Sequence, residues 1–181
     1  MGDGSLERVE GAARVYRLTG APPEPDLAGL RAAWLQLGAG QVASARLRRP
    51  AAVASHRSAA AALGLGDPLD GTQEFYVPLR RQLRRPDLRL RVRPALADDQ
   101  WRVVTGLPVC TAERVVVDLL AEREDESAVA RICQDALRAG LLSWGRLVDL
   151  AGTAAGPYGA ETGEALAASL AGLEGPADGR E

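Results

Sequence analysis

The sequence predicts an α+β fold, and three observations lead to that prediction. The chain has 181 residues, 46% of them hydrophobic, which is enough for one full domain with a real core. Several stretches repeat apolar residues at the three- and four-residue spacing of a helix face. Other, shorter stretches are rich in Val, Tyr and Phe or alternate apolar and charged residues, as strands do. We expect a hairpin within residues 1–20, a mixed α/β domain with a small sheet and several helices over residues 26–173, and a flexible tail over residues 174–181.

The first part of the chain is predicted to form the hairpin and then a helix. Residues 6–18 (LERVEGAARVYRL) indicate two short strands around the turn EGAA. The prolines of residues 21–25 (APPEP) lack amide donors and restrict φ, so we expect a connection there. Asp26 is the expected cap of the next helix, which Gly38 and Gly40 end. The apolar residues of this helix recur at helical spacing: Leu27, Leu30, Trp34 and Leu37.

The middle of the chain is predicted to supply the sheet. A short helix over residues 41–47 and a break at Pro50 come first. Strands are then expected at residues 75–78 (FYVP), 88–93 (LRLRVR) and 101–104 (WRVV). The second of these alternates apolar residues with arginine, which predicts one apolar face and one basic face.

The second half of the chain is predicted to be mainly helical. The phrase GLPV leads into Thr111, a good N-cap for the helix AERVVVDLLAE. Within that helix Arg114 and Asp118 stand four residues apart and are expected to pair. The acidic run Glu122 to Glu126 is interpreted as a solvated loop and the N-terminus of the next helix.

The last three predicted helices follow that acidic run. The clearest one covers residues 125–140, because its apolar residues keep helical spacing until Gly140 stops it. Ser143 caps a shorter helix. An Ala-rich helix is expected over residues 161–173. The helix after Ser143 is predicted to turn three residues inward: Trp144, Leu147 and Val148.

The stretch VASHRSAAAALGLGD holds the only histidine of the chain, His56, between Ser55 and Arg57. A catalytic Ser55 would need a base within hydrogen-bond reach and a third group to orient that base. Adjacent residues at a helix start point about 100° apart, so Ser55 and His56 do not form such a pair by themselves. We therefore interpret Ser55 as the N-cap of a helix that runs through Ala62. His56 and Arg57 then lie in its first turn, where a cation is unfavourable, and we assign them to structure or partner contact.

Residue usage argues against several chemistries. All 22 basic residues are arginine, so a P-loop lysine, a Schiff base and the usual carboxylate-plus-lysine nuclease are excluded. Cys110 and Cys133 have no CxxC spacing and no nearby histidine, which favours buried hydrophobes over zinc ligands. We expect no enzymatic activity, no cofactor and no metal. The chain has no apolar run of ~18 residues and no signal-peptide pattern, so a cytoplasmic protein without membrane contact is expected.

Charge is distributed unevenly along the chain. Residues 46–93 carry 11 arginines against 4 acidic residues, and residues 94–181 carry 7 against 15. A basic segment in an otherwise acidic protein favours contact with nucleic-acid phosphates or an acidic protein surface. A solvated arginine face is the alternative, and the sequence leaves both open. The candidate binding residues are Arg80, Arg81, Arg84, Arg85, Arg89 and Arg91.

Four phrases taken in order resemble a known family. They are VASHRSAAAALGLGD, EFYVP, VVTGLPVCTAERVVVDLLAE and DALRAGLLSWGRLVDL. Together they resemble the AbiEi family antitoxins of type IV toxin-antitoxin systems, in their high-GC actinobacterial form, over about residues 5–170. One mild departure is Cys110-Thr111, where the family has two threonines. The residues that match the family motif are Ser55, His56, Arg57, Gly106, Pro108, Thr111, Arg114 and Asp118.

The resemblance implies a non-enzymatic protein with two binding functions. An N-terminal winged helix would bind operator DNA and repress the protein's own operon, and the following domain would oppose a cognate nucleotidyltransferase-like toxin. The hairpin matches the wing, so the resemblance assigns DNA-backbone contacts to Arg8, Arg14 and Arg17. Because a recognition helix precedes the wing and only about five residues do so here, we expect that the start codon was assigned too late. The alternative is a truncated, non-catalytic protein-interaction module that has lost DNA binding.

Overall fold

The computed structural model describes residues 6–8, 15–18, 25–38, 47–48, 50–67, 71–81, 85–94 and 96–173. Within these ranges it contains six helices, a two-stranded ribbon and a five-stranded mixed sheet, which confirms the α+β prediction. The strands are β1 (Leu6–Arg8), β2 (Tyr16–Leu18), β3 (Val53–Ala54), β4 (Gln73–Val77), β5 (Leu88–Val92), β6 (Trp101–Val104) and β7 (Leu107–Cys110). The helices are α1 (Pro25–Leu37), α3 (His56–Ala62), α4 (Ala112–Ala121), α5 (Glu126–Arg138), α6 (Trp144–Gly152) and α7 (Gly163–Ala171), with 3-10 turns at η1 (Asp98–Gln100) and η2 (Gly156–Tyr158).

The five-stranded sheet has the order β5-β4-β3-β7-β6, with the shortest strand at its centre. β3 runs antiparallel to β4 and parallel to β7, and β4 runs parallel to β5. β6 and β7 form an antiparallel hairpin. Its turn, Thr105-Gly106, has positive φ at both residues, as a tight two-residue hairpin turn requires.

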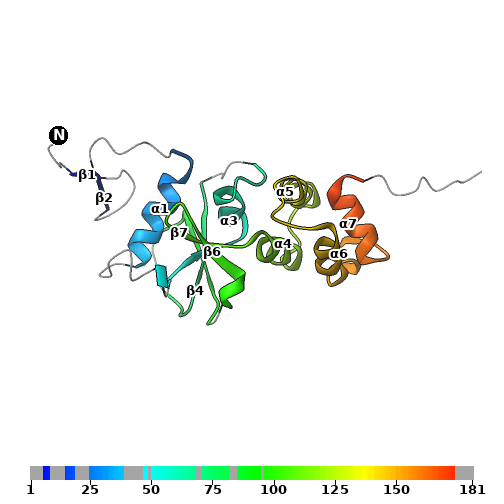
Figure 1. Ribbon diagram of the computed structural model, residues 1–181. Coiled ribbons are helices and arrows are strands. Elements are labelled where there is room, and N and C mark those ends of the chain that lie inside the picture. Colours follow the sequence, from blue (N-terminus) through cyan, green and yellow to red (C-terminus); the bar gives the residue numbers. More distant parts are fainter. Residues whose placement is uncertain are drawn as a thin grey trace, which may run out of the picture.

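Helices cover the two faces of the sheet. α1 packs on β3 and β4, and the indole Nε1 of Trp34 donates a hydrogen bond to the carbonyl of Ala52 at 3.2 Å. α3 packs on β4 and β7 and also contacts α4. Figure 1 shows α1 and α3 on opposite sides of the sheet. The β1–β2 ribbon meets this part of the fold through Val15, which is buried against Ala32 of α1.

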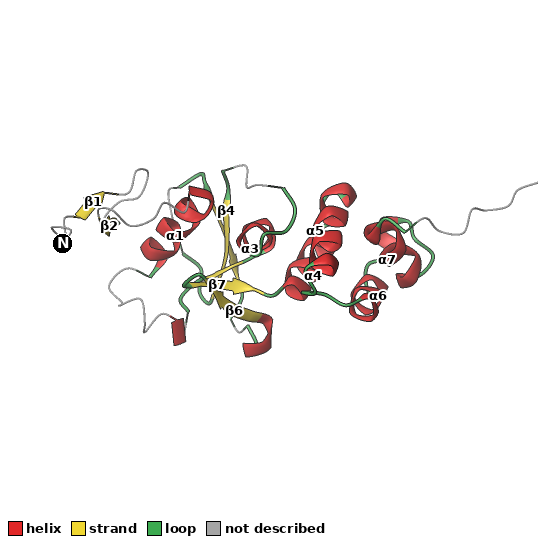
Figure 2. Cartoon of the chain, turned by 45° about the horizontal axis from the view of Figure 1, so that its top comes forward, coloured by secondary structure: helices red, strands yellow, loops and turns green. Residues whose placement is uncertain are grey.

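The helices of the second half form a separate layer beyond α4. α5 and α6 each pack on α4, and α7 packs on both of them, so that the four helices stack at one end of the sheet (Figure 2). Side-chain oxygens cap all four of them: Thr111, Asp125, Ser143 and Thr162 each accept a hydrogen bond from the third amide beyond. Apolar side chains of the sheet and of all six described helices belong to one continuous cluster.

Several sequence predictions are confirmed in this fold. The ribbon, the strand at 101–104, the stop at Gly140 and the Ser143 cap are present as predicted. Four other predictions fall on residues outside the described ranges. These are the EGAA turn, the connection predicted at residues 21–25 except for Pro25, the helix predicted over residues 41–47 except for Leu47, and the tail.

Three details of the prediction are wrong. α1 begins at Pro25, so Asp26 lies inside the helix, and proline suits this first position because its missing amide hydrogen has no helical partner there. GLPV is predicted only as a connection to the next helix, but residues 107–110 form strand β7. Trp144 is 38% exposed instead of buried, while Leu147 is fully buried. Within the described ranges, no helix is both long and apolar enough to cross a membrane.

Candidate functional site

Three of the motif residues, His56, Arg114 and Asp118, lie in a largely buried group of charged and polar side chains between the sheet and helices α3 and α4. We call this group the polar cluster. Glu74 and Tyr76 come from β4, Arg91 from β5, and the remaining members from α3 and from α4 with its C-cap. Its members are His56, Glu74, Tyr76, Arg91, Arg114, Asp118 and Glu122.

Glu74 is the centre of the polar cluster and is only 5% exposed. One carboxylate oxygen accepts a hydrogen bond from the guanidinium of Arg91 at 2.9 Å, and the other accepts from the amide of Arg57 at 3.0 Å. Arg91 also pairs with Glu122, donating from Nε at 2.6 Å and from a terminal nitrogen. The Arg91 guanidinium therefore joins a buried carboxylate to one at the end of α4, and these contacts satisfy the charge of Glu74.

The SHRS sequence wraps around Glu74 with its backbone and hydroxyl groups. The amide of Ser55 donates to the carbonyl of Glu74 at 3.0 Å. The amide of Glu74 in turn donates to Oγ of Ser58 at 2.8 Å. With the Arg57 amide, three of the four motif residues bond to one residue of β4. The motif thus anchors α3 to the sheet.

Ser55 occupies the N-cap position of α3, as the sequence predicts, but its hydroxyl does not cap the helix. Its Oγ is buried and has no hydrogen-bond partner. The N-cap position is thus confirmed, whereas the side-chain cap is missing: His56 has a φ of +49°, so the chain enters the helix through a left-handed residue. Oγ of Ser55 consequently does not reach the free amides of the first turn.

His56 is held deep in the polar cluster, with 2% of its surface exposed. Its Nε2 lies 3.3 Å from a carboxylate oxygen of Glu122, and its ring centroid lies 5.4 Å from that of Tyr76. Nδ1 has no hydrogen-bond partner. Burial, together with the positive charge of Arg91, lowers the pKa of His56 below 6.5, and the nearby carboxylates only partly oppose this shift. The neutral imidazole is therefore the form favoured by the fold.

Arg114 and Asp118 form the predicted pair on α4, next to Tyr76. Asp118 is 3% exposed, so this pair is buried instead of lying on a helix surface. Burial and a hydrogen bond with Asp118 raise the pKa of Tyr76 well above 10. One oxygen of Asp118 and Nε of Arg114 have no partner. The predicted pairing is confirmed, and a buried carboxylate in this position depends on its arginine.

The remaining motif residues stabilise the backbone around β7. Gly106 has a φ of +81° in the β6–β7 turn. Pro108 lies in β7 opposite Val103 and is buried. Oγ1 of Thr111 accepts from the amide of Arg114 at 3.4 Å, which confirms Thr111 as the N-cap of α4. These positions support the hairpin and the helix that border the polar cluster.

The predicted binding arginines have different environments. Arg91 is 16% exposed, so the predicted basic face of β5 is not a solvent-facing surface along its whole length. Arg81 donates to the carbonyl of Leu37, and Arg85 pairs with Asp87 and donates to Gln36. Arg80 and Arg89 are exposed, and Arg89 lies 3.8 Å from Glu74 with 60% of its side chain exposed. Arg84 lies outside the described residues.

The predicted DNA contacts lie on the ribbon. Arg8 is exposed at the end of β1, directly opposite Tyr16, which is 56% exposed. Arg17 lies in β2 opposite Glu7. Arg14 lies outside the described residues. Within this ribbon, Arg8 and Tyr16 form an exposed cross-strand pair.

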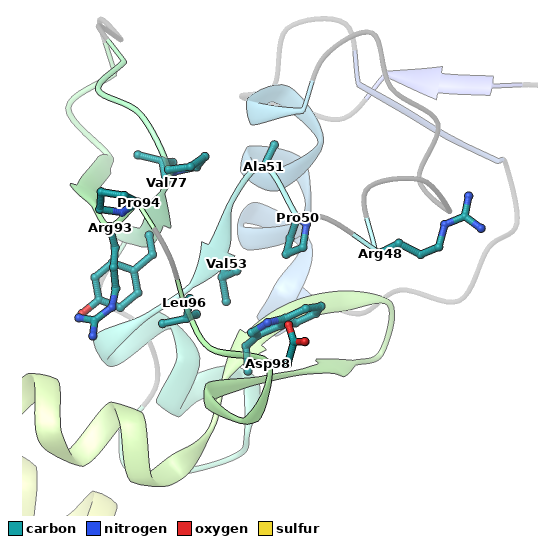
Figure 3. Close-up of a pocket in the computed structure, with 12 residues that line it drawn as sticks. Arg48, Pro50, Ala51, Val53, Val77, Arg93, Pro94, Leu96 and Asp98 are labelled. Carbon is teal, nitrogen blue, oxygen red and sulfur yellow. The ribbon is translucent and has the colours of Figure 1, made fainter.

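A pocket of about 430 Å³ opens beside the polar cluster, at the ends of β4 and β5 (Figure 3). Tyr76 belongs to both the pocket and the polar cluster, because it lines the pocket and contacts His56. Sequence reasoning missed this pocket because its residues come from four separate stretches. Its only sequence signal was Arg93, the last arginine of the LRLRVR strand. The lining residues are Arg48, Pro50, Ala51, Val53, Tyr76, Val77, Pro78, Arg93, Pro94, Leu96, Asp98 and Trp101.

The chemistry of the cysteines and acids adds little to this site. Cys110 and Cys133 are both buried, as expected, and burial raises the pKa of each thiol to about 12. In the described part of the chain, no group of three His, Cys, Asp or Glu side chains is arranged to hold a metal ion.

Comparisons with protein family models, with curated proteins and with solved structures find no match to this chain.

Proposed function

We propose that this protein is a non-enzymatic antitoxin-like binding protein that opposes a nucleotidyltransferase-like toxin. The observation that carries the proposal is an exposed edge of the sheet that offers both arginines and large apolar side chains to solvent. This edge, which we call the β5 edge, consists of Leu79, Arg80, Arg89 and Val92. The four-phrase resemblance to AbiEi antitoxins supplies the identity of the partner.

The β5 edge has the composition of a protein-binding surface. Leu79 is 74% exposed and Val92 is 51% exposed, and both are unusual for large apolar side chains beside a packed sheet. β5 is the outermost strand of the sheet, so one side of its backbone pairs with no other strand in the described part of the chain. Arg80 follows Leu79 in the chain, and Arg89 lies in the same strand as Val92, so this edge is positively charged and favours an acidic partner.

The polar cluster supports the same proposal from the inside of the protein. Its charged groups are bonded to one another, and His56 and Asp118 are almost completely buried. The motif residues therefore shape the domain that presents the β5 edge. Binding would depend on exposed residues outside the motif.

Growth rescue tests this proposal. The chain is co-expressed with a candidate cognate nucleotidyltransferase-like toxin, and surviving colonies are counted. We expect the parent chain to rescue growth and the double variant Arg80→Ala/Arg89→Ala to rescue it poorly, with an unchanged circular dichroism spectrum. The matched control is Arg131→Ala/Arg138→Ala, which removes two exposed arginines of α5 that are 55% and 72% exposed.

The outcomes separate the parts of the proposal. A parent chain that fails to rescue contradicts the antitoxin function and favours the protein-interaction module. Equal rescue by the β5-edge variant and its control shows that this edge is not the partner surface.

Operator binding is a second candidate function, favoured by the exposed Arg8 and Tyr16 pair on the ribbon. A two-stranded ribbon with an outward arginine suits contact with DNA phosphates. Gel shift with the upstream intergenic DNA at about 50 and about 200 mM salt should show binding that weakens with salt and is reduced in Arg8→Ala. Equal DNA affinity of the parent chain and of Arg8→Ala would show that the ribbon does not contribute to operator binding.

A further inference from the structure

The pocket beside Tyr76 adjoins the β5 edge, because its lining residues Pro78 and Arg93 are chain neighbours of Leu79 and Val92, but it shares no residue with that edge and is not used by the proposed function. It is bordered by the ends of β4 and β5, by the chain leading into β3, and by the segment that precedes β6. Its volume of about 430 Å³ falls within the size range of small-molecule sites, roughly 300 to 1,000 Å³. A ligand with one or two rings would fill such a space.

One wall of the pocket offers a cation without an anionic partner. The guanidinium carbon of Arg93 lies 5.3 Å from the ring centroid of Tyr76, so the aromatic face holds the side chain in place. Nε of Arg93 is buried and has no hydrogen-bond partner. Among the residues that the structure describes, no carboxylate lies within ion-pair distance of Arg93. The terminal nitrogens of the guanidinium are not enclosed in this way and make no hydrogen bond to any described residue, so an anionic oxygen of a ligand can bind to them.

The other cation of the pocket does not serve the same purpose. The side chain of Arg48 extends away from the other labelled residues, whereas Arg93 lies alongside Pro94 at the opposite wall (Figure 3). The anionic group of a ligand is therefore expected at Arg93. This places the charged end of the ligand beside β5.

The remaining surface is suited to a flat apolar body. Pro50 and Pro94 border the pocket from opposite sides, and Leu96 lies between them (Figure 3). Trp101 is half-buried and lines the same space, so part of its indole is free to stack on a ring. The apolar lining consists of Pro50, Ala51, Val53, Val77, Pro78, Pro94, Leu96 and Trp101.

Asp98 supplies an acceptor away from Arg93. It is exposed, it begins the 3-10 turn η1, and Leu96 lies between it and Arg93 (Figure 3). A carboxylate in this position would repel an anion and accept a hydrogen bond from an N–H or O–H group. The ligand is thus expected to have its anionic group at one end and a donor at the other.

We propose that this pocket binds a small planar organic anion, a ring system that carries a phosphate or a carboxylate group for Arg93 and an N–H or O–H donor for Asp98. Phosphate and carboxylate share the oxygen geometry that an arginine fork recognises. The nucleoside monophosphates and the indole carboxylates are two sources of this chemistry.

Calorimetric titration of the full chain tests the proposal with two probes, adenosine monophosphate and indole-3-acetate. At least one should bind with a saturable heat. The same ring without its anionic group, adenosine or 3-methylindole, should bind about tenfold more weakly or worse, because it loses the charged hydrogen bonds to Arg93. The probe that binds identifies the source of the anion.

Two variants and a control connect the binding to this pocket. Arg93→Gln should weaken binding of the charged probe by about tenfold or more and leave the uncharged ring unaffected. Leu96→Trp should block both, because a larger side chain fills the space between Arg93 and Asp98. Arg102→Gln, an exposed β6 position that does not line the pocket, should bind like the parent. If Arg93→Gln does not fold, as seen by circular dichroism, Leu96→Trp carries the test.

Two results would overturn the proposal. One is the absence of binding by both probes at millimolar concentration. The other is binding that neither Arg93→Gln nor Leu96→Trp weakens. Growth rescue by a folded Leu96→Trp chain keeps this test separate from the proposed antitoxin function, since that function depends on the β5 edge.

Discussion

Nε2 of His56 lies 3.3 Å from Oε1 of Glu122, with the imidazole 2% exposed and the carboxylate 36% exposed. The contact ties the first residue of α3 to the end of α4. It also places the only histidine of the chain beside the Arg91 guanidinium, which pairs with the same carboxylate. His56, which the sequence assigns to structure or partner contact, is therefore a buried link between two helices and the sheet.

The buried imidazole should make stability depend on pH in a defined window. The pKa of folded His56 lies below 6.5, because burial and Arg91 disfavour its charged form. Below pH 6.5 the unfolded chain takes up a proton on this residue that the folded chain does not. The free energy of unfolding therefore decreases as the pH is lowered from 6.5 to the pKa of the folded state. Above pH 6.5 the residue is neutral in both states and contributes nothing to the pH dependence.

Urea unfolding at about pH 7.5 and about pH 5.5 measures this dependence. The parent chain should lose free energy of unfolding at the lower pH, and His56→Asn should lose less. Asparagine is chosen because it tolerates the φ of +49° and does not titrate. Glu122, whose pKa is lowered chiefly by the hydrogen bond from Arg91, affects stability only below pH 4.5 and lies outside the window. Equal slopes for parent and variant would show that His56 is not responsible.

Removal of Arg91 should be severely destabilising. Arg91→Ala leaves Glu74, at 7% side-chain exposure, without its principal countercharge, which costs about 3–5 kcal/mol. Arg89→Ala is the matched control, since Arg89 approaches the same carboxylate oxygen at 3.8 Å but is 60% exposed. That variant should cost about 1 kcal/mol at most. Urea midpoints measure both, and similar losses for the two variants would contradict the central role given to Arg91.

The close approach of α6 and α7 depends on the glycine at the start of α7. A Cβ at Gly163 would lie 2.5 Å from Cα of Gly152 and 2.6 Å from its amide nitrogen. Gly163→Ala must therefore separate two helix backbones, at a cost of about 1–3 kcal/mol. Gly145→Ala in α6 meets no atom within 4 Å and should stabilise by about 0.5–1 kcal/mol. Thermal unfolding of both variants gives the comparison, and a neutral Gly163→Ala would disprove the tight packing.

Both cysteines should be unreactive in the folded protein. Burial raises the pKa of Cys110 and of Cys133 to about 12, and neither side chain is exposed. An aromatic disulfide reagent at about pH 8 should consume no thiol in the native chain and two thiols in concentrated urea, because only a thiolate reacts. Rapid loss of one thiol under native conditions would show that one of these sites opens readily.

Local signals predicted much of the secondary structure. Thr111, Ser143 and Gly140 mark helix ends because capping depends on one residue and the few that follow it. Strands β3 and β7 were missed for a physical reason. β3 has two residues, and β7 is buried along its whole length, so neither shows the alternation by which a strand is recognised.

The two candidate sites show where local patterns stop being informative. The exposed positions Arg80 and Arg89 lie within the arginine-rich segment that the sequence singled out. The partners of Arg91 could not be predicted, because Glu74 and Glu122 come close only through the pairing of β4 with β5 and the packing of α3 on α4. Arg93 likewise became a candidate binding residue only because the fold brings Pro50, Leu96 and Trp101 around the same pocket.

The sequence by itself determined the α+β class, most helix ends and the presence of a basic segment, because propensity, capping and apolar spacing act over a few residues. Tertiary structure alone decided which charges are buried and which remain exposed. An ion pair depends on the distance between side chains, and that distance is set by the sheet order β5-β4-β3-β7-β6 and the helices packed on it. For this reason the only histidine of the sequence serves the fold, and the exposed arginines and the pocket carry the functional proposals.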